Sequence, residues 1–328
     1  MAGNCSQPKC YPEDSGCNIE GCINLSDCKY YGEKDASKKE DKQEIDTEGH
    51  RISWTGNTMG LYDLNFLTAS RKPILIGVTG VASAGKTTFL ATLYCLIRQG
   101  AEIGEYSFAG SLTLNGWEDI AWYLSWKSNA EIQFPDHTTN NSGRVPGLLH
   151  LSLKNKTGKN IDLILTDAPG EWFDHWSNNI NSENAIGAQW IYENCDGFLL
   201  FADSDMLSGS QRGNAKRQLK QVADRLIENI NDRPIGLIWS KSDLELTHQT
   251  KEQIIKHIEA TPFKHFNQFE TSVQEGSSGE FHKAILGSVN WVIEVLNQNC
   301  NTLPKISVAK PEDMFLSKRS INELYGKT

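Results

Sequence analysis

Apolar runs and amphipathic stretches alternate along the chain from about residue 70 onward. Short runs rich in Val, Ile and Leu predict buried strands, whereas apolar residues spaced three and four apart predict helices. Strands that alternate with helices indicate an α/β fold of three layers, in which helices cover both faces of a mostly parallel central sheet. The expected strands are 74–79, 147–153, 161–166, 197–202, 235–240 and 266–273. The expected helices are 86–99, 116–127, 182–194, 212–230, 250–259 and 279–298.

The same pattern divides the chain into four parts. Residues 1–32 form a small Cys-rich extension, and residues 33–69 form a charged linker and lead-in. Within the linker, residues 33–48 carry many charges and almost no apolar anchors, which is typical of a solvated segment. Residues 70–300 hold the alternating strands and helices and are expected to form one domain. Residues 301–328 have weak periodicity and are expected to be a C-terminal tail.

Composition narrows the class of protein. The chain has 328 residues, of which 38% are hydrophobic, so a soluble globular domain with a sizeable core is expected. Its formal net charge of −9, with no basic block to offset it, argues against a nucleic-acid partner. No apolar run approaches the roughly 18 residues that a membrane helix needs. The polar N-terminus lacks the apolar core of a signal peptide, so we expect a cytoplasmic protein.

Cysteines gather near the N-terminus, where five of the eight in the chain fall within the first 28 residues. In a reducing cytoplasm, clustered thiols bind metal more often than they pair as disulfides. The gaps between them hold four, six, four and five residues, and none is the tight Cys-x-x-Cys of a zinc ribbon. We favour a zinc site built from four of the five, and the alternative is a reduced, flexible tail. The cysteines are Cys5, Cys10, Cys17, Cys22 and Cys28.

The most informative motif follows the first expected strand. It runs Gly80-Val-Ala-Ser-Ala-Gly-Lys-Thr-Thr88 and leads into an apolar-periodic helix. Glycines let such a loop wrap a phosphate with backbone N–H groups pointing inward, and the helix N-terminus adds positive potential. Lys86 is expected to reach the β- and γ-phosphates, and the Thr87 hydroxyl is expected to hold Mg²⁺. The residues assigned to the nucleotide in this loop are Gly80, Ser83, Ala84, Gly85, Lys86, Thr87 and Thr88.

A second motif, Asp167-Ala-Pro-Gly170, comes directly after the expected strand 161–166. An acidic residue at this place can act on Mg²⁺ through water. Gly170 offers an unhindered backbone N–H to a γ-phosphate. The alternative is a plain Asp-Pro-Gly turn after a strand.

A third motif, Lys241-Ser-Asp243, follows the expected strand 235–240. The Asp243 carboxylate can accept hydrogen bonds from guanine N1 and from the exocyclic amine of that base. Adenine has neither donor, so it would leave a buried carboxylate unpaired and be rejected. The Lys241 stem can lie over the base plane. Ser272 and Val273 close the last expected strand, where a backbone N–H can contact the guanine carbonyl.

Because these motifs occur in this order, the sequence resembles the P-loop GTPases of the translation-factor and Ras-like (TRAFAC) superclass. Within that superclass it is similar to the bacterial double-GTPase group of conflict and signalling systems, through the stretches 108–117, 144–150, 166–173 and 198–203. The resemblance covers about residues 70–300. It implies a Ras-like P-loop NTPase fold, binding of GTP and GDP with Mg²⁺, and a switch that a protein partner or a second protomer reads.

Two residues depart from the pattern of the superclass. Ser240 stands where Asn or Thr is usual, and its hydroxyl can still tie two loops together. Glu171 stands where Ras-like enzymes carry a water-orienting glutamine, and its charge would repel the γ-phosphate. We therefore expect slow hydrolysis unless a partner or a second protomer supplies an arginine finger to the site. The basic stretch 212–225 is a candidate for presenting such an arginine across a dimer. The alternative is that this stretch is a solvated helix face. His175 is either a second water-positioning group or a surface histidine.

The superclass also supplies a threonine to Mg²⁺ from the segment between the first helix and the second strand. That segment, 101–146 in this chain, is long for the superclass. A Pro-x-x-Thr spacing within it favours Thr138, and Thr139 is the alternative. With Thr87 and Asp167, Thr138 completes the expected Mg²⁺ ligands.

These residues predict a GTPase in which Mg²⁺ assists the attack of water on the γ-phosphate of GTP. Lys86, Thr138 and Glu171 are the expected catalytic residues. A nucleotide-binding scaffold with little hydrolysis is the alternative, because Glu171 opposes the reaction. An ATPase is a third hypothesis, under which Asp243→Asn leaves the nucleotide preference unchanged.

Overall fold

The computed structural model describes residues 58–122, 124, 146–274 and 279–299. The strands in this part are β1 (Ile74–Thr79), β2 (Tyr106–Gly110), β3 (Gly147–Asn155), β4 (Asn160–Asp167), β5 (Gly197–Asp203), β6 (Ile235–Ser240) and β7 (Phe266–Glu270). They form one sheet in the order β2-β3-β4-β1-β5-β6-β7. From β4 to β7 all neighbours are parallel, whereas β3 runs antiparallel to both β2 and β4. The sheet is therefore mixed and mostly parallel.

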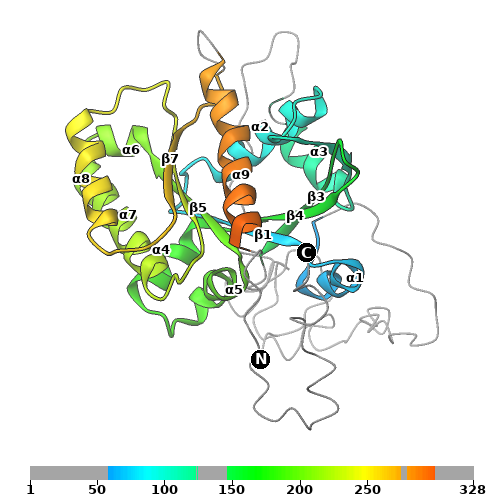
Figure 1. The fold of residues 1–328 in the computed structure, drawn as a ribbon. Coiled ribbons are helices and arrows are strands. Elements are labelled where there is room, and N and C mark those ends of the chain that lie inside the picture. The colour runs from blue at the N-terminus through cyan, green and yellow to red at the C-terminus, as the bar shows by residue number, and fades with distance from the viewer. Residues whose placement is uncertain (1–57, 123, 125–145, 275–278, 300–328) are drawn as a thin grey trace, which may run out of the picture. The chain divides into compact units, whose positions relative to one another are not determined.

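Helices cover both faces of this sheet (Figure 1). The helices of the described part are α1 (Leu64–Ser70), α2 (Lys86–Arg98), α3 (Leu114–Trp122), α4 (Gly170–Asn178), α5 (Ile186–Asn194), α6 (Ser204–Ser208), α7 (Arg212–Ile227), α8 (His248–Glu259) and α9 (Glu280–Asn299), with short 3-10 helices η2 (Leu61–Asp63) and η3 (Glu183–Ala185). One core lies between the sheet and α2, α3 and α9, and the other between the sheet and α4, α5, α7 and α8. On β1, Ile76 and Val78 belong to the first core and Leu75 packs on the second, because successive strand residues point to opposite faces. The result is the expected three-layer arrangement.

Strand positions agree with the sequence pattern except at the sheet's edges. All six expected strands are present, and the expected strand 266–273 ends earlier, at Glu270. β2 was not among the expected strands. Tyr106 is its only buried residue, so this edge strand has no apolar run that sequence reasoning could detect.

Three helices, α1, α4 and α6, lie outside the expected set. α4 takes the place of a plain turn after the Asp-Pro-Gly motif: it begins at Gly170, and its Trp172, Phe173 and Trp176 are buried in the second core. α1 lies in the stretch expected as linker and lead-in, where Leu67 packs against β3 and β4. The expected helix 182–194 is divided into η3 and α5.

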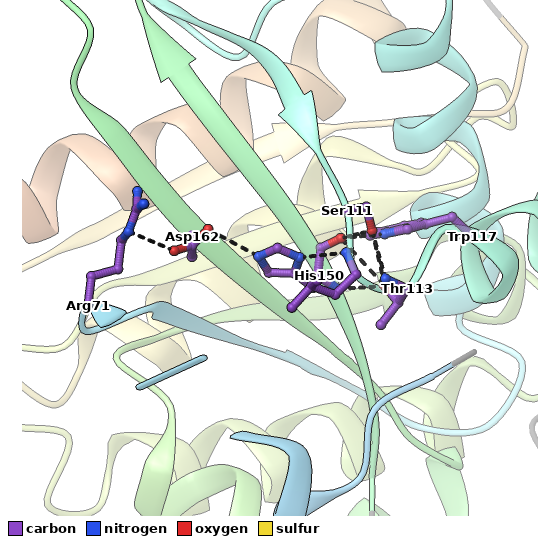
Figure 2. Close-up of polar contacts among 7 residues, drawn as sticks. Arg71, Ser111, Thr113, Trp117, His150 and Asp162 are labelled. Carbon is purple, nitrogen blue, oxygen red and sulfur yellow. Dashed lines mark hydrogen bonds and ion pairs between the residues drawn. The ribbon is translucent and has the colours of Figure 1, made fainter. Parts of the chain in front are cut away.

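A line of polar contacts joins Arg71, the residue directly after α1, to β4, β3 and α3, and we call it the His150 network (Figure 2). Arg71 Nε lies 3.0 Å from Asp162 Oδ2, and His150 Nε2 lies 3.2 Å from Asp162 Oδ1. On its other side, the His150 ring accepts a hydrogen bond at Nδ1 from the Leu112 backbone N–H at 2.9 Å. The Trp117 indole N–H donates to the His150 carbonyl at 2.8 Å. The network therefore fixes the start of α3 to the antiparallel half of the sheet.

The contacts of His150 determine its tautomer. Because Nδ1 accepts from Leu112, the ring proton must be on Nε2, which donates it to Asp162. His150 is only 3% exposed. Burial lowers the pKa of this histidine below its ordinary value, although Asp162 acts in the opposite direction. The ring is therefore neutral at physiological pH and serves as a structural connector.

Candidate functional site

The loops that follow β1, β4, β6 and β7 meet around a cavity of about 440 Å³. The carboxyl ends of parallel strands share one edge of a sheet, which is the usual ligand-binding edge of an α/β fold. The lining includes residues 82–89, 168–171 and 271–274, together with Lys241 and Asp243. The volume falls within the roughly 300–1,000 Å³ that is typical of small-molecule sites.

The loop between β1 and α2 owes its shape to unusual backbone angles. Gly85, which directly precedes α2, has a φ of +83°, a left-handed conformation that glycine adopts without steric cost. Ser83 also has a positive φ, +61°. Such angles are uncommon for residues with a side chain, and residues that adopt them are found most often in functional loops. α2 therefore starts at the cavity wall, where the positive end of its dipole favours an anion.

Lys86 is held inside this loop. Its ammonium donates to the carbonyls of Gly80 at 2.9 Å and Val81 at 2.8 Å. Burial lowers the pKa of Lys86 to about 8, and the neighbouring carboxylates of Asp167 and Glu171 partly oppose that shift. An anion placed in the cavity would favour the charged ammonium in the same way.

Two oxygen donors lie side by side next to Lys86. The Thr87 hydroxyl donates to Asp167 Oδ1 at 3.0 Å, and Asp167 is the last residue of β4. A hydroxyl and a carboxylate are hard donors, and Mg²⁺ in nucleotide sites takes one or two carboxylates plus substrate phosphates. Across the described residues, no group of three or more His, Cys, Asp or Glu side chains gathers as a metal cage. The donor set therefore fits a Mg²⁺ that takes its remaining ligands from phosphate and water.

Asp243 also lines the cavity and is fixed by the loop after β7. Ser272 Oγ donates to Asp243 Oδ1 at 2.5 Å. The Ser242 backbone N–H donates to the Thr271 carbonyl at 3.0 Å, which joins the two loops. Asp243 is thereby presented at the cavity wall as a hydrogen-bond acceptor.

The loop after β7 is anchored in turn by α9. His282 Nε2 lies 2.8 Å from the Val273 carbonyl oxygen. Because a carbonyl can only accept, the histidine is the donor of this hydrogen bond. The Gln274 backbone N–H donates to Ser272 Oγ at 3.1 Å. These contacts hold residues 271–274 in place as part of the cavity wall.

Lys241 and Ser240 connect the end of β6 to β5. Ser240 Oγ donates to the Ala202 carbonyl at 3.3 Å, so in this structure the serine links the end of β6 to β5 rather than one loop to another. The Lys241 ammonium lies 2.7 Å from Asp203 Oδ2. Sequence reasoning missed Asp203, although an acidic residue at the end of an apolar strand is the same signal that singled out Asp167.

α4 begins directly beside the loop that carries Lys86. A Cβ atom on Gly170 would lie 2.1 Å from the backbone nitrogen of Ala82, so only glycine fits at this place. Glu171 follows it, exposed and lining the cavity. In the first turn of α4, the Glu171 carboxylate is favoured by the helix dipole.

The cavity collects most of the residues that the sequence motifs single out. Gly80 and Asp167 are not among the residues that line it, but the Gly80 carbonyl accepts from Lys86 and the Asp167 carboxylate accepts from Thr87. His175 is exposed on α4 and is not among the residues that line the cavity. Thr138 and its alternative Thr139 lie outside the described residues, as do the N-terminal cysteines Cys5, Cys10, Cys17, Cys22 and Cys28.

A protein-family model described as Double-GTPase 2 matches residues 74–292, which is more than half of the chain. The chain belongs to the Double-GTPase 2 family. This Double-GTPase 2 protein therefore contains a GTPase domain, and the resemblance inferred from its motifs is confirmed. No curated protein matches its sequence.

Solved structures similar to this Double-GTPase 2 protein include a small GTPase. The Arl6 (BBS3) small GTPase from Trypanosoma brucei with the bound nucleotide analogue GppNp is 12% identical, with a TM-score of 0.38 over 69% of this chain and 99% of that one. A mutated variant of SsGBP is 13% identical, with a TM-score of 0.38 over 74% of this chain and 62% of that one. Within the described ranges, no helix has the length and apolar character needed to cross a membrane.

Proposed function

We propose that this protein binds GTP, cleaves it to GDP and phosphate with Mg²⁺, and acts as a molecular switch. The observation that supports the proposal is the meeting of three independent motifs around one cavity: Lys86 with its loop, Glu171 at the start of α4, and Asp243 after β6. Each motif alone could be an ordinary turn or loop without a ligand. An ordinary turn does not explain why all three line one cavity of nucleotide size.

The phosphate side is built from the loop and α2. The Lys86 ammonium would contact the β- and γ-phosphates, and the backbone N–H groups of the loop would donate to the same phosphates. Thr87 and Asp167, with Thr138 from the preceding segment, would hold Mg²⁺, which when bound neutralises charge on the phosphates. Gly170 would donate its backbone N–H to the γ-phosphate.

Asp243 is the residue that would select guanine. Its carboxylate, held by Ser272, can accept from the N1–H and exocyclic amine of guanine. Adenine lacks both donors and would leave the carboxylate desolvated and unpaired. A backbone N–H near Val273 would add a contact to the guanine carbonyl.

Hydrolysis would proceed by attack of water on the γ-phosphorus, with cleavage of its bond to the bridging oxygen and release of GDP. Lys86 stabilises the negative charge that spreads over the γ-phosphoryl oxygens. Glu171 lines the cavity from α4 and would orient the attacking water. Its negative charge opposes the approach of that water to an anionic phosphate, so turnover by the isolated chain is slow.

Nucleotide binding by the full chain tests this proposal. We expect GDP and GTP to bind in the presence of Mg²⁺ much more tightly than ADP and ATP, measured with fluorescent analogues and by calorimetry. Asp243→Asn should remove most of that preference while inorganic pyrophosphate still competes at the phosphate loop. Equal affinity for adenine and guanine nucleotides in the wild type would contradict the proposal.

As a switch, the protein would be read by a partner in its triphosphate state. The γ-phosphate orders the loops that contact it, and a partner that binds those loops distinguishes GTP from GDP. We expect the partner to be another protein of a bacterial defence or signalling system, or a second protomer. Capture of the same protein by the wild type in a non-hydrolysable GTP analogue, but not in GDP and not by Lys86→Met, supports this role.

A scaffold that holds nucleotide without cleaving it is the second candidate. The position of Glu171 in the cavity favours it, because its charge is close enough to Lys86 to oppose part of the burial-driven fall in the pKa of that lysine. Phosphate release followed over tens of minutes separates the two. A switch releases phosphate, faster with its partner, whereas a scaffold does not in either condition.

A zinc site in the N-terminal extension is a separate proposal. Zinc measured by metal analysis of the full chain, and lost from Cys17→Ser and Cys22→Ser, supports it. A full-length protein purified without chelator that contains no zinc contradicts it.

A further inference from the structure

A carboxylate from the neighbouring strand holds the Lys241 ammonium. Lys241 Nζ lies 2.7 Å from Asp203 Oδ2. Asp203 is the last residue of β5, and it is in register with Ser240, the residue directly before Lys241. The parallel pairing of β5 with β6 therefore places Asp203 beside the loop that carries Lys241.

The Asp203 carboxylate has a fixed orientation. Its side chain is only 3% exposed. Oδ1 accepts hydrogen bonds from the backbone N–H groups of Asp205 at 3.0 Å and Met206 at 3.3 Å, and thereby caps α6. Oδ2 accepts from the Lys241 ammonium. A buried carboxylate with donors on both oxygens is a rigid anchor.

Lys241 is also constrained through its backbone. Its φ is +53°, a left-handed conformation that residues with side chains rarely adopt. Its carbonyl accepts from the Leu244 backbone N–H at 3.0 Å, which closes a turn. Its side chain lines the cavity between the anchored ammonium and this turn. Both ends of the aliphatic stem are therefore fixed.

We propose that Asp203 is a positioning residue for the nucleotide base, because it holds the Lys241 stem as a preformed wall of the guanine pocket. The inference rests on the proposed function, since it requires a guanine nucleotide in the cavity. Asp203 touches no nucleotide atom, and selection of guanine belongs to Asp243. Without Asp203 the lysine side chain must be ordered on binding, which lowers affinity by about three- to tenfold.

Asp203→Asn tests the inference because asparagine is isosteric and caps a helix as well as aspartate does. We expect the Kd for GDP to rise by about three- to tenfold. The Kd for IDP, which lacks the exocyclic amine, should rise by the same factor, so the ratio of the two stays unchanged. The single-turnover hydrolysis rate of bound GTP should also be unchanged, because Lys241 belongs to the base side of the cavity.

The matched control is Asp205→Asn. The Asp205 carboxylate lies 3.9 Å from Lys241 Nζ and is 60% exposed, so it anchors the lysine weakly. We expect its effect on the Kd for GDP to be less than about twofold. A larger effect from this variant than from Asp203→Asn overturns the inference.

A double-mutant cycle shows whether Asp203 acts through Lys241. Lys241→Met keeps an aliphatic stem but removes the charge, and Asp203→Asn should have no further effect on GDP binding in that background. If Asp203→Asn does not fold, the comparison of Lys241→Arg with Lys241→Met takes its place. Arginine still pairs with Asp203 and should bind GDP more tightly than methionine, and equal losses overturn the inference.

The outcomes separate the inference from the proposed function. A wild type that binds no GDP contradicts the proposed function. A wild type that binds GDP, with Asp203→Asn binding equally tightly, contradicts only the role of Asp203. A fall in the ratio of GDP to IDP affinity also overturns it, because Asp203 would then maintain the Asp243 loop as a whole.

Discussion

The Cβ position of Gly170 lies 2.1 Å from the backbone nitrogen of Ala82, so the first residue of α4 is in direct contact with the loop that carries Lys86. Any side chain at residue 170 forces α4 and the loop apart. Such a displacement moves Glu171, which follows Gly170, away from its place in the cavity.

We therefore expect Gly170→Ala to lower the single-turnover rate of GTP hydrolysis by about tenfold or more, since displacements near 1 Å at an active site have effects of this size. The affinity for GDP, which has no γ-phosphate, should change much less. Gly213→Ala on α7 is the control, because an added Cβ there meets nothing within 4 Å. Equal hydrolysis by both variants would show that α4 does not need this contact.

Lys86 gives nucleotide binding a pH dependence. Its pKa is about 8 in the folded protein, below the ordinary 10.5, because of burial. Phosphates in the cavity favour the ammonium, so binding takes up a proton once the pH exceeds about 8, and the affinity for GDP should fall by up to about tenfold per pH unit above that value. Binding titrations with GDP between pH 7 and pH 9 measure how the affinity changes with pH. The same titrations of Lys86→Met show how much of that change comes from titration of the guanine base.

The same lowered pKa acts in the opposite direction on folding. Between about pH 8 and pH 10.5 the unfolded chain binds more protons at Lys86 than the folded chain does. The contribution of Lys86 to the free energy of unfolding therefore rises with pH across that window. Measured by urea unfolding, the free energy of unfolding of the wild type should rise relative to that of Lys86→Met between pH 8 and pH 10.5, and parallel curves would contradict the assignment.

Glu171 is expected to limit hydrolysis by its charge. Glu171→Gln keeps an oxygen that can orient water and removes the repulsion, so the single-turnover rate should rise by about tenfold, on the scale of one nearby charge. Glu171→Ala removes both effects and should not exceed the wild type. If both variants are slower than the wild type by the same factor, Glu171 acts instead as a general base. Phosphate release after rapid mixing with GTP and Mg²⁺ measures all three.

The His150 network should be important for stability rather than for catalysis. His150→Leu leaves Asp162 and the Leu112 backbone N–H without their ring partner, and we expect the free energy of unfolding to fall by about 2–4 kcal/mol. The same substitution at His248, whose side chain is 87% exposed, should change it by less than about 0.5 kcal/mol. Chemical denaturation measures both variants.

The network also predicts sensitivity to acid. The pKa of His150 is lowered by burial, so below about pH 6.5 the unfolded chain binds more protons than the folded chain does. Stability should therefore fall as the pH drops below that value, and His150→Leu should lose this component of the decline. Denaturant unfolding between pH 5 and pH 7.5 tests the prediction.

The central parallel strands β1, β5 and β6 could be predicted from sequence because they are mostly or fully buried and appear as continuous apolar runs. β1 and β6 match their predicted bounds for this reason. β2 could not be predicted, because four of its five residues, from Ser107 to Gly110, are not buried. α4 was missed because its buried Trp172, Phe173 and Trp176 follow a proline-glycine pair that is more typical of a turn.

The candidate site was predictable where a short motif carries its own chemistry. The phosphate loop, Glu171 and Asp243 needed only sequence order to be placed near one another. Asp203 was not predicted because its role depends on the register of β5 with β6, which brings residues 38 positions apart into contact. The contact between Gly170 and Ala82 likewise depends on three-dimensional packing that no local pattern records.

The reversed direction of β3 has a consequence for the metal. In a parallel strand the carboxyl end reaches the cavity edge, but in β3 the amino end does, because Gly147 is in register with Asp167. The chain thus enters the sheet next to the proposed metal-binding carboxylate. Thr138 precedes Gly147 by nine residues, a tether of at most about 32 Å when fully extended. A deletion or insertion within that tether should therefore change Mg²⁺-dependent GTP binding without altering the sheet.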